Sequence, residues 1–119
     1  MGQPVVHFEI TGQDAKKLQA FYSELFGWEV NADNEFVTRE GNTDEDGAGI
    51  GGGISPGPEG YPGHVTVYVR VPDVEAALAK AEALGGTRMM GPETVMEGLT
   101  IGLFNDVEGH TIGVMSGAM

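Results

Sequence analysis

The sequence predicts an α+β fold in which one domain, residues 1–119, contains two tandem β-α-β-β-β modules. Three observations predict it: apolar residues that alternate as in half-buried strands, two amphipathic helical patterns, and the same order of elements in both halves. Module 1 spans about residues 1–54, a linker covers 55–63, and module 2 spans about 64–119. We expect curved, mixed sheets whose uncovered faces surround a cleft.

Module 1 begins with an alternating strand, VVHFEI, at residues 5–10. Its polar face carries His7 and Glu9, and its apolar face is Val6, Phe8 and Ile10. Asp14 is a good N-cap for the helix that follows, and Gly27 ends it. The helical stripe predicted to face the core is Leu18, Phe21, Tyr22 and Leu25.

Three further strands are expected in module 1. Two short ones lie at residues 28–30 and 35–40, separated by the turn-forming NADN. The acidic hairpin GNTDEDG then leads into a glycine-rich strand at residues 48–54. Its sequence, AGIGGGI, lacks the lysine and following helix of a phosphate-binding loop, so we interpret it as a bare strand beside a ligand.

Module 2 repeats the pattern after the linker SPGPEGYPG, which suits neither helix nor central strand. The strand HVTVYVRV, residues 64–71, places Thr66, Tyr68 and Arg70 opposite a face of valines. Asp73 caps the second helix, and it follows Asp14 by 59 residues. The predicted core stripe of this helix is Val74, Ala77, Leu78, Ala81 and Leu84, and strands are expected at 87–90, 99–104 and 110–115.

Composition excludes several classes of function. The chain carries 18 acidic against 6 basic residues, a formal net charge of -12, which disfavours nucleic acid and anionic membranes as partners. There is no cysteine, so disulfides and thiolate chemistry are excluded. The first residues lack the features of a secretory signal, and a cytoplasmic location is therefore expected.

Three segments resemble the vicinal oxygen chelate superfamily, which includes glyoxalase I, bleomycin-resistance proteins and extradiol dioxygenases. They are HFEITGQDAKKLQAFYSELFGWEV, VYVRVPDVEAALAKAEALGG and LFNDVEGHTIGV. The resemblance spans nearly the whole chain and implies paired modules around a pocket, with a homodimer as the expected assembly. It is specific for the fold and says less about chemistry, because this fold hosts many activities.

The resemblance also implies four strand positions that hold a metal in the metal-using members. His7 matches the first of these positions, Thr66 stands at the second, and the two in the closing strands match Gly51 and Gly113. Metal sites normally use three or four donor side chains. We therefore expect no metal and no other cofactor, with a rearranged divalent-metal site of His7, Glu9 and His64 as the less favoured alternative.

The remaining candidates are ligand contacts. Tyr68 and Arg70 lie on the predicted pocket face, although a strand arginine more often reaches solvent. The stretch 92–100 reads as a rim or lid, in which Met96 is a deformable apolar contact and Glu97 could act as a base. The ligand-binding set that we expect is His7, Glu9, Gly51, Thr66, Tyr68, Arg70, Met96, Glu97 and Gly113. His64 is expected to be an exposed edge residue, and His110 to be structural.

Two hypotheses of function follow. The first is a small-molecule-binding protein of the bleomycin-resistance type, without a metal, for a mostly apolar or aromatic ligand. The second is a glyoxalase-like lyase or another small-molecule enzyme of the same superfamily, such as an oxygenase or isomerase. The sequence favours binding and leaves open whether the chain catalyses a reaction.

Overall fold

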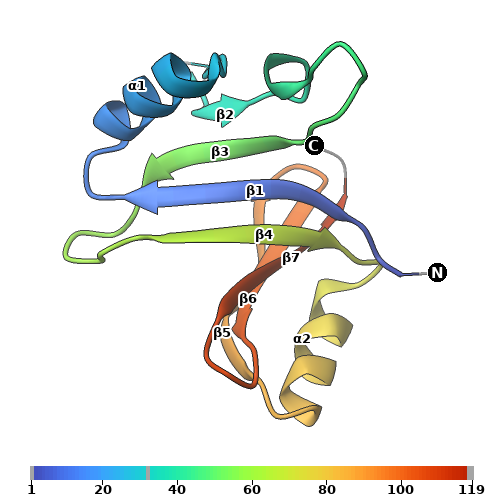
Figure 1. Ribbon diagram of the computed structural model, residues 1–119. Helices are drawn as coiled ribbons and strands as arrows, with labels where there is room; N and C mark the ends of the chain where they lie inside the picture. Colours follow the sequence, from blue (N-terminus) through green and yellow to red (C-terminus); the bar gives the residue numbers. More distant parts are fainter. Residues whose placement is uncertain (1, 32, 118–119) are drawn as a thin grey trace. The chain divides into compact units, whose positions relative to one another are not determined.

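A computed structural model describes residues 2–31 and 33–117 (Figure 1). Over these residues the chain has an α+β fold with two α-helices and seven strands in mixed, open β-sheet, as expected. It divides into two compact units, an N-terminal one of His7–Val65 and a C-terminal one that joins the residues up to Val6 with those from Thr66 onward. No helix in the described part of the chain is long and apolar enough to cross a membrane.

The N-terminal unit is built around a parallel pair of strands. Its elements are β1 (Val5–Gly12), α1 (Ala15–Phe26), β2 (Phe36–Val37), the 3-10 turn η1 (Glu40–Asn42) and β3 (Gly51–Pro56). β3 pairs with β1 in parallel and with β2 in the antiparallel sense. A parallel pair needs a long crossover, and α1 lies on that crossover (Figure 1).

Local sequence explains where α1 begins and ends. The side chain of Asp14 accepts a hydrogen bond of 3.1 Å from the backbone N–H of Lys17. Gly27 takes the left-handed conformation, with φ of 74°, that ends many helices. Under the helix lies a core of Ile10, Val37 and Ile54, with Phe8, Leu18, Tyr22, Trp28 and Val30 packed against it.

The predicted stripe of α1 is wrong at two positions. Phe21 is 59% exposed and Leu25 is 58% exposed, whereas Ala15 and Gln19 are buried. The buried stripe thus runs along Ala15 and Gln19, and Phe21 and Leu25 lie further round the helix, away from its contact with β3. Burial of Gln19 is compatible with its polar amide because Nε2 donates to the carbonyl oxygen of Ile54 at 2.8 Å.

The short strands of module 1 are also smaller than predicted. Residues 28–30 contribute one isolated bridge, between Val30 and Val37, and the strand expected at 35–40 is reduced to β2. Two turn hydrogen bonds restrict β2 at its start: Asn31 Oδ1 accepts from the N–H of Asp33, and Asn34 Oδ1 accepts from the N–H of Phe36. These side chains compete with the β-ladder for backbone groups.

The C-terminal unit contains β4 (His64–Arg70), α2 (Val74–Ala83), β5 (Thr87–Met96), β6 (Leu99–Asn105) and β7 (Thr111–Gly117), although the first two residues of β4 belong to the other unit. β4 and β7 are parallel, and β7–β6 and β6–β5 are antiparallel. One core lies under α2 and is made of Val71, Val74, Leu78 and Val114. A second cluster contains Tyr68, Leu99 and Met115, with Val6, Ile101 and Leu103 packed against it.

Leu84 is a second correction to the predicted helix stripes. It is 69% exposed because α2 ends at Ala83 and Leu84 occupies the C-cap, beyond the last turn that faces the sheet. The segment 92–100, expected to be a rim or lid, is largely the hairpin of β5 and β6, in which Met96 pairs with Leu99.

Candidate functional site

The polar face of β1 carries the candidate functional side chains of the N-terminal unit. In the parallel pair, His7 lies opposite Gly51 and Glu9 lies opposite Gly53. Phe8 and Ile10 pack into the core under α1, and strand alternation therefore directs His7 and Glu9 to the other face of the sheet. The facing residues of β3 are glycines, so the strand next to His7 presents backbone rather than side chains.

His7 has a mostly apolar environment. It is 8% exposed, and its ring meets Phe36 edge-on with centroids 5.8 Å apart. Burial lowers the pKa of His7 below its ordinary value of 6.5, an effect that the nearby Glu9 carboxylate partly offsets. The neutral imidazole is therefore favoured, and it retains one donor and one acceptor nitrogen.

A chain of three hydrogen-bonded side chains lies in the same unit. His64 Nε2 is 2.6 Å from Glu9 Oε2, and Tyr61 Oη is 2.6 Å from His64 Nδ1. The backbone N–H of His64 donates to Thr11 Oγ1 at 3.1 Å, which fixes the start of β4. His64 is therefore half-buried and doubly hydrogen-bonded, which corrects the expectation of an exposed edge residue.

The donor and acceptor atoms of Glu9, His64 and Tyr61 determine which group donates in each of these two hydrogen bonds. An ionised carboxylate only accepts hydrogen bonds, so Nε2 of His64 carries a proton toward Glu9. With a neutral imidazole, Nδ1 is the acceptor and the hydroxyl of Tyr61 donates to it. If His64 gains a proton, Nδ1 donates to Tyr61 instead, and the tyrosine hydroxyl can then donate to another group. A relay of this kind can hold or move one proton.

The corresponding positions of the C-terminal unit are packed. The hydroxyl of Thr66 donates to the carbonyl oxygen of Thr111 at 2.5 Å. Tyr68 is 4% exposed, within the cluster of Leu99 and Met115, and lies opposite Gly113 in the β4–β7 pair. A Cβ at Gly113 would come within 2.6 Å of the Tyr68 ring, so this glycine makes room for a side chain of its own unit.

The other predicted contacts lie at the surface. Arg70 is exposed, and its backbone N–H donates to the carbonyl oxygen of Pro4 at 2.9 Å. Met96 and Glu97 are exposed at the end of the β5–β6 hairpin. His110 lies in the turn before β7 and bonds the carboxylate of Asp106 through Nδ1 at 3.0 Å.

The donor set does not fit a metal ion of the kind that the metal-using members hold. His7 faces Gly51 and Tyr68 faces Gly113, and neither glycine has a ligand to offer. Glu9 and His64 use their facing atoms on each other. Among the described residues there is no group of three or more His, Cys, Asp or Glu side chains arranged to hold a metal.

A family model described as a glyoxalase-like domain matches residues 7–115, which is most of the sequence. The chain belongs to the glyoxalase-like domain family. This confirms the resemblance to the vicinal oxygen chelate superfamily. A search of curated proteins finds no match for this glyoxalase-like chain.

Solved structures support the same fold. A Streptomyces coelicolor methylmalonyl-CoA epimerase variant, in complex with 2-nitronate-propionyl-CoA, is similar with a TM-score of 0.64 and 18% identity, covering 98% of this chain and 99% of that one. The Mycobacterium tuberculosis methylmalonyl-CoA epimerase has a TM-score of 0.60 and 15% identity, covering 97% and 88%. A glyoxalase/bleomycin resistance protein/dioxygenase superfamily member from Vibrio splendidus 12B01 has a TM-score of 0.56 and 18% identity, covering 97% and 99%.

Sequence reasoning did not include Tyr61 in the candidate site. The residue lies in the proline- and glycine-rich segment that was interpreted only as a linker. A usable signal was present, since Tyr61 and His64 are three residues apart around the Pro62–Gly63 turn. The sequence brings Glu9 and His64 together only as alternative ligands of a metal, whereas in the structure they are hydrogen-bond partners of each other.

Proposed function

We propose that this glyoxalase-like protein binds a mostly apolar or aromatic small molecule on the β1–β3 face of its N-terminal unit, without a resident metal. The observation that carries the proposal is the setting of His7, a neutral buried imidazole beside Phe36 and opposite Gly51. Small-molecule sites typically combine apolar surface with a few fixed polar groups. The space over Gly53 supports an aromatic ligand, because the ring of Phe36 and the Nε2 atom of His7 line it at 3.5 Å and 3.7 Å from where a Cβ would stand.

Two measurements on the purified protein test this proposal. Elemental analysis is expected to give a metal content far below one ion per chain. A thermal-shift screen against aromatic compounds is expected to find ligands that stabilise the folded protein, because a ligand that binds only the native state adds to the free energy of unfolding.

Matched variants locate the binding. His7→Ala should abolish the shift in melting temperature, whereas His110→Ala should keep it, because His110 lies in the surface turn beside Asp106. Metal bound at one ion per chain, or a ligand shift that survives His7→Ala, would refute the proposal.

The Tyr61–His64–Glu9 relay favours a second candidate, a small-molecule enzyme that moves a proton. An isomerase-type reaction needs a group that alternates between acid and base, which such a relay supplies. Turnover in assays of the purified protein would support this candidate if Tyr61→Phe lowered kcat more than KM changed. Activity in the methylglyoxal–glutathione lyase assay that depends on added zinc or nickel would instead favour the metal-dependent alternative.

A further inference from the structure

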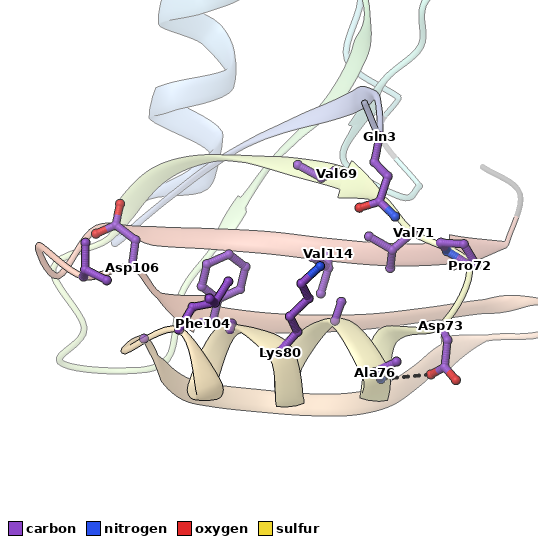
Figure 2. A pocket seen from close by; sticks show the side chains of 15 residues that line it. Gln3, Val69, Val71, Pro72, Asp73, Ala76, Lys80, Phe104, Asp106 and Val114 are labelled. Atoms are coloured by element: carbon purple, nitrogen blue, oxygen red, sulfur yellow. Dashed lines mark hydrogen bonds between the residues drawn. The ribbon is translucent and has the colours of Figure 1, made fainter. Parts of the chain in front are cut away.

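A groove of about 560 Å³ runs along α2 within the C-terminal unit (Figure 2). Its lining residues all belong to the C-terminal unit, whereas the β1–β3 face to which we assign ligand binding belongs to the N-terminal unit. The apolar surface of the groove is formed mainly by Val69, Val71, Ala77, Ala81, Phe104 and Val114. Its volume is within the range of sites that bind small organic molecules.

The groove exists because α2 presents alanines where larger side chains would fill the space. The helix packs mainly on β5, β6 and β7, with Val74 and Leu78 buried in that contact. Ala77 and Ala81 are only half-buried, and they line the groove together with Val69 of β4. A methyl group covers too little surface to close the gap between helix and strand.

One positive charge stands over this apolar surface. Lys80 extends from α2 across the groove, between Asp106 at one end and Asp73 at the other (Figure 2). Among the described residues, Lys80 has no carboxylate within ion-pair distance, whereas Arg88 pairs with Glu75 and Glu82. An unpaired ammonium beside apolar surface complements an amphiphilic anion.

The two carboxylates at the ends of the groove have partners of their own. Asp73 accepts a hydrogen bond of 3.1 Å from the N–H of Ala76 at the start of α2. Asp106 accepts from the N–H groups of His110 and Glu108, and these bonds hold the pKa of Asp106 below its usual value. Backbone hydrogen bonds thus hold both carboxylates at the ends of the groove, and Lys80 is the one cation among the lining residues that the structure describes.

We propose that this groove binds a small monocarboxylic acid with an extended apolar body, whose carboxylate meets Lys80 while its hydrocarbon lies along Val69, Val114 and Phe104. A single lysine suits a single negative charge, because it provides a point charge without the fork of donors that an arginine offers to phosphate. The acidic ends of the groove disfavour a ligand of higher charge.

Isothermal titration calorimetry with decanoate, kept below its micelle-forming concentration, tests the inference on the full chain, with decanol as the uncharged probe. We expect saturable binding of decanoate and chemical-shift changes in NMR spectra at Val69 and Val114. Lys80→Gln should weaken decanoate binding about three- to fivefold, as for loss of an exposed ion pair, and leave decanol unaffected. Lys16→Gln is the matched control, since it removes a lysine from α1, and it should change neither affinity.

Ala77→Phe and Ala81→Phe test the groove itself by filling it. Each should weaken both probes by about tenfold or more, because the phenyl ring takes the volume of the ligand. Circular dichroism identifies any variant that does not fold, and the other variant then decides. Unchanged decanoate affinity in a folded filled variant, or in Lys80→Gln, overturns the proposal.

The oligomeric state provides a further test. If decanoate fails to bind and the filled variants convert a wild-type dimer to monomers, the groove is a subunit interface and the ligand assignment is wrong.

Discussion

Glu9 and His64 lie 55 residues apart in the sequence and are joined by a hydrogen bond of 2.6 Å between Oε2 and Nε2. The bond connects the middle of β1 to the first residue of β4. His64 also bonds Tyr61 through its other nitrogen, so the side chains of Glu9 and Tyr61 both depend on one imidazole.

The first prediction concerns coupling through this imidazole. Tyr61→Phe and Glu9→Gln should each lower the free energy of unfolding by about 0.5–1.5 kcal/mol, the usual value of one hydrogen bond. The loss of unfolding free energy in the double variant should differ from the sum of the two single losses by at least about 0.5 kcal/mol, because both partners act on His64. Urea denaturation of the four proteins measures the difference. Strict additivity would show that the three side chains do not act as a unit.

The second prediction concerns pH and His7. Burial lowers the pKa of His7 in the folded protein, so the unfolded chain takes up a proton at higher pH than the folded one. The contribution of neutral His7 to stability is therefore complete above an unfolded-state pKa of about 6.5 and decreases as the pH falls through the lowered folded value. In His7→Gln, the free energy of unfolding should therefore fall less as the pH is lowered. The measurement is the free energy of unfolding of wild type and variant from about pH 8 to about pH 5. Parallel curves of free energy against pH for the two proteins would contradict the prediction.

The third prediction compares two buried glycines. Gly113→Ala places a Cβ within 2.6 Å of the Tyr68 ring in a packed core, and it should destabilise the protein by about 1–3 kcal/mol. Gly53→Ala is the control, because its Cβ would contact Phe36 at 3.5 Å and His7 at 3.7 Å, which are ordinary distances. It should change stability by less than about 1 kcal/mol. Equal losses of stability in the two variants would mean that the packing of the Tyr68 ring does not depend on the absence of a side chain at Gly113.

The fourth prediction follows from the orientation of α1. Gln19→Ala leaves the buried carbonyl of Ile54 without its donor and should cost about 1–3 kcal/mol of unfolding free energy. Phe21→Ser and Leu25→Ser should each stay within about 0.5 kcal/mol, since both side chains are exposed. Thermal and urea denaturation measure these differences.

The same surface variants also test assembly, because exposed apolar residues on one helix are typical of an association surface. Sedimentation of wild type against Phe21→Ser and Leu25→Ser tests whether this helix face joins two copies, as expected for a homodimer. A dimer that keeps its dissociation constant in both variants would place the contact elsewhere.

Much of the fold could be predicted because the relevant signals are local. The caps at Asp14 and Asp73 and the alternation in β1 and β4 depend on neighbouring residues, and the structure shows these features where the sequence indicates them. The orientation of α1 could not be predicted in the same way. It depends on which face of the helix packs on β3, and the hydrogen bond that buries Gln19 there reaches a carbonyl 35 residues away in the sequence.

The candidate site shows a similar division. The resemblance matches Gly51 and Gly113 to positions in the closing strands, and the structure places them opposite His7 and Tyr68, whereas the sequence pointed to Thr66 as the counterpart of His7. The partner of each polar group was harder to predict, since a hydrogen bond between Glu9 and His64 depends on how two distant segments meet. The ring of Tyr68 fills the space over Gly113, and a sequence pattern that places Tyr68 on a strand face does not show what lies beside it.

The residues up to Val6 belong to the C-terminal unit, where Pro4 accepts a hydrogen bond from Arg70 and Val6 packs near Tyr68. During synthesis, these early residues leave the ribosome long before β7 exists. The C-terminal unit can therefore be completed only after its final strand has been made, and until then the nascent chain exposes an unmatched strand end. Such a segment is where a chaperone would have most to protect, and where a pause in translation would most affect the yield of folded protein.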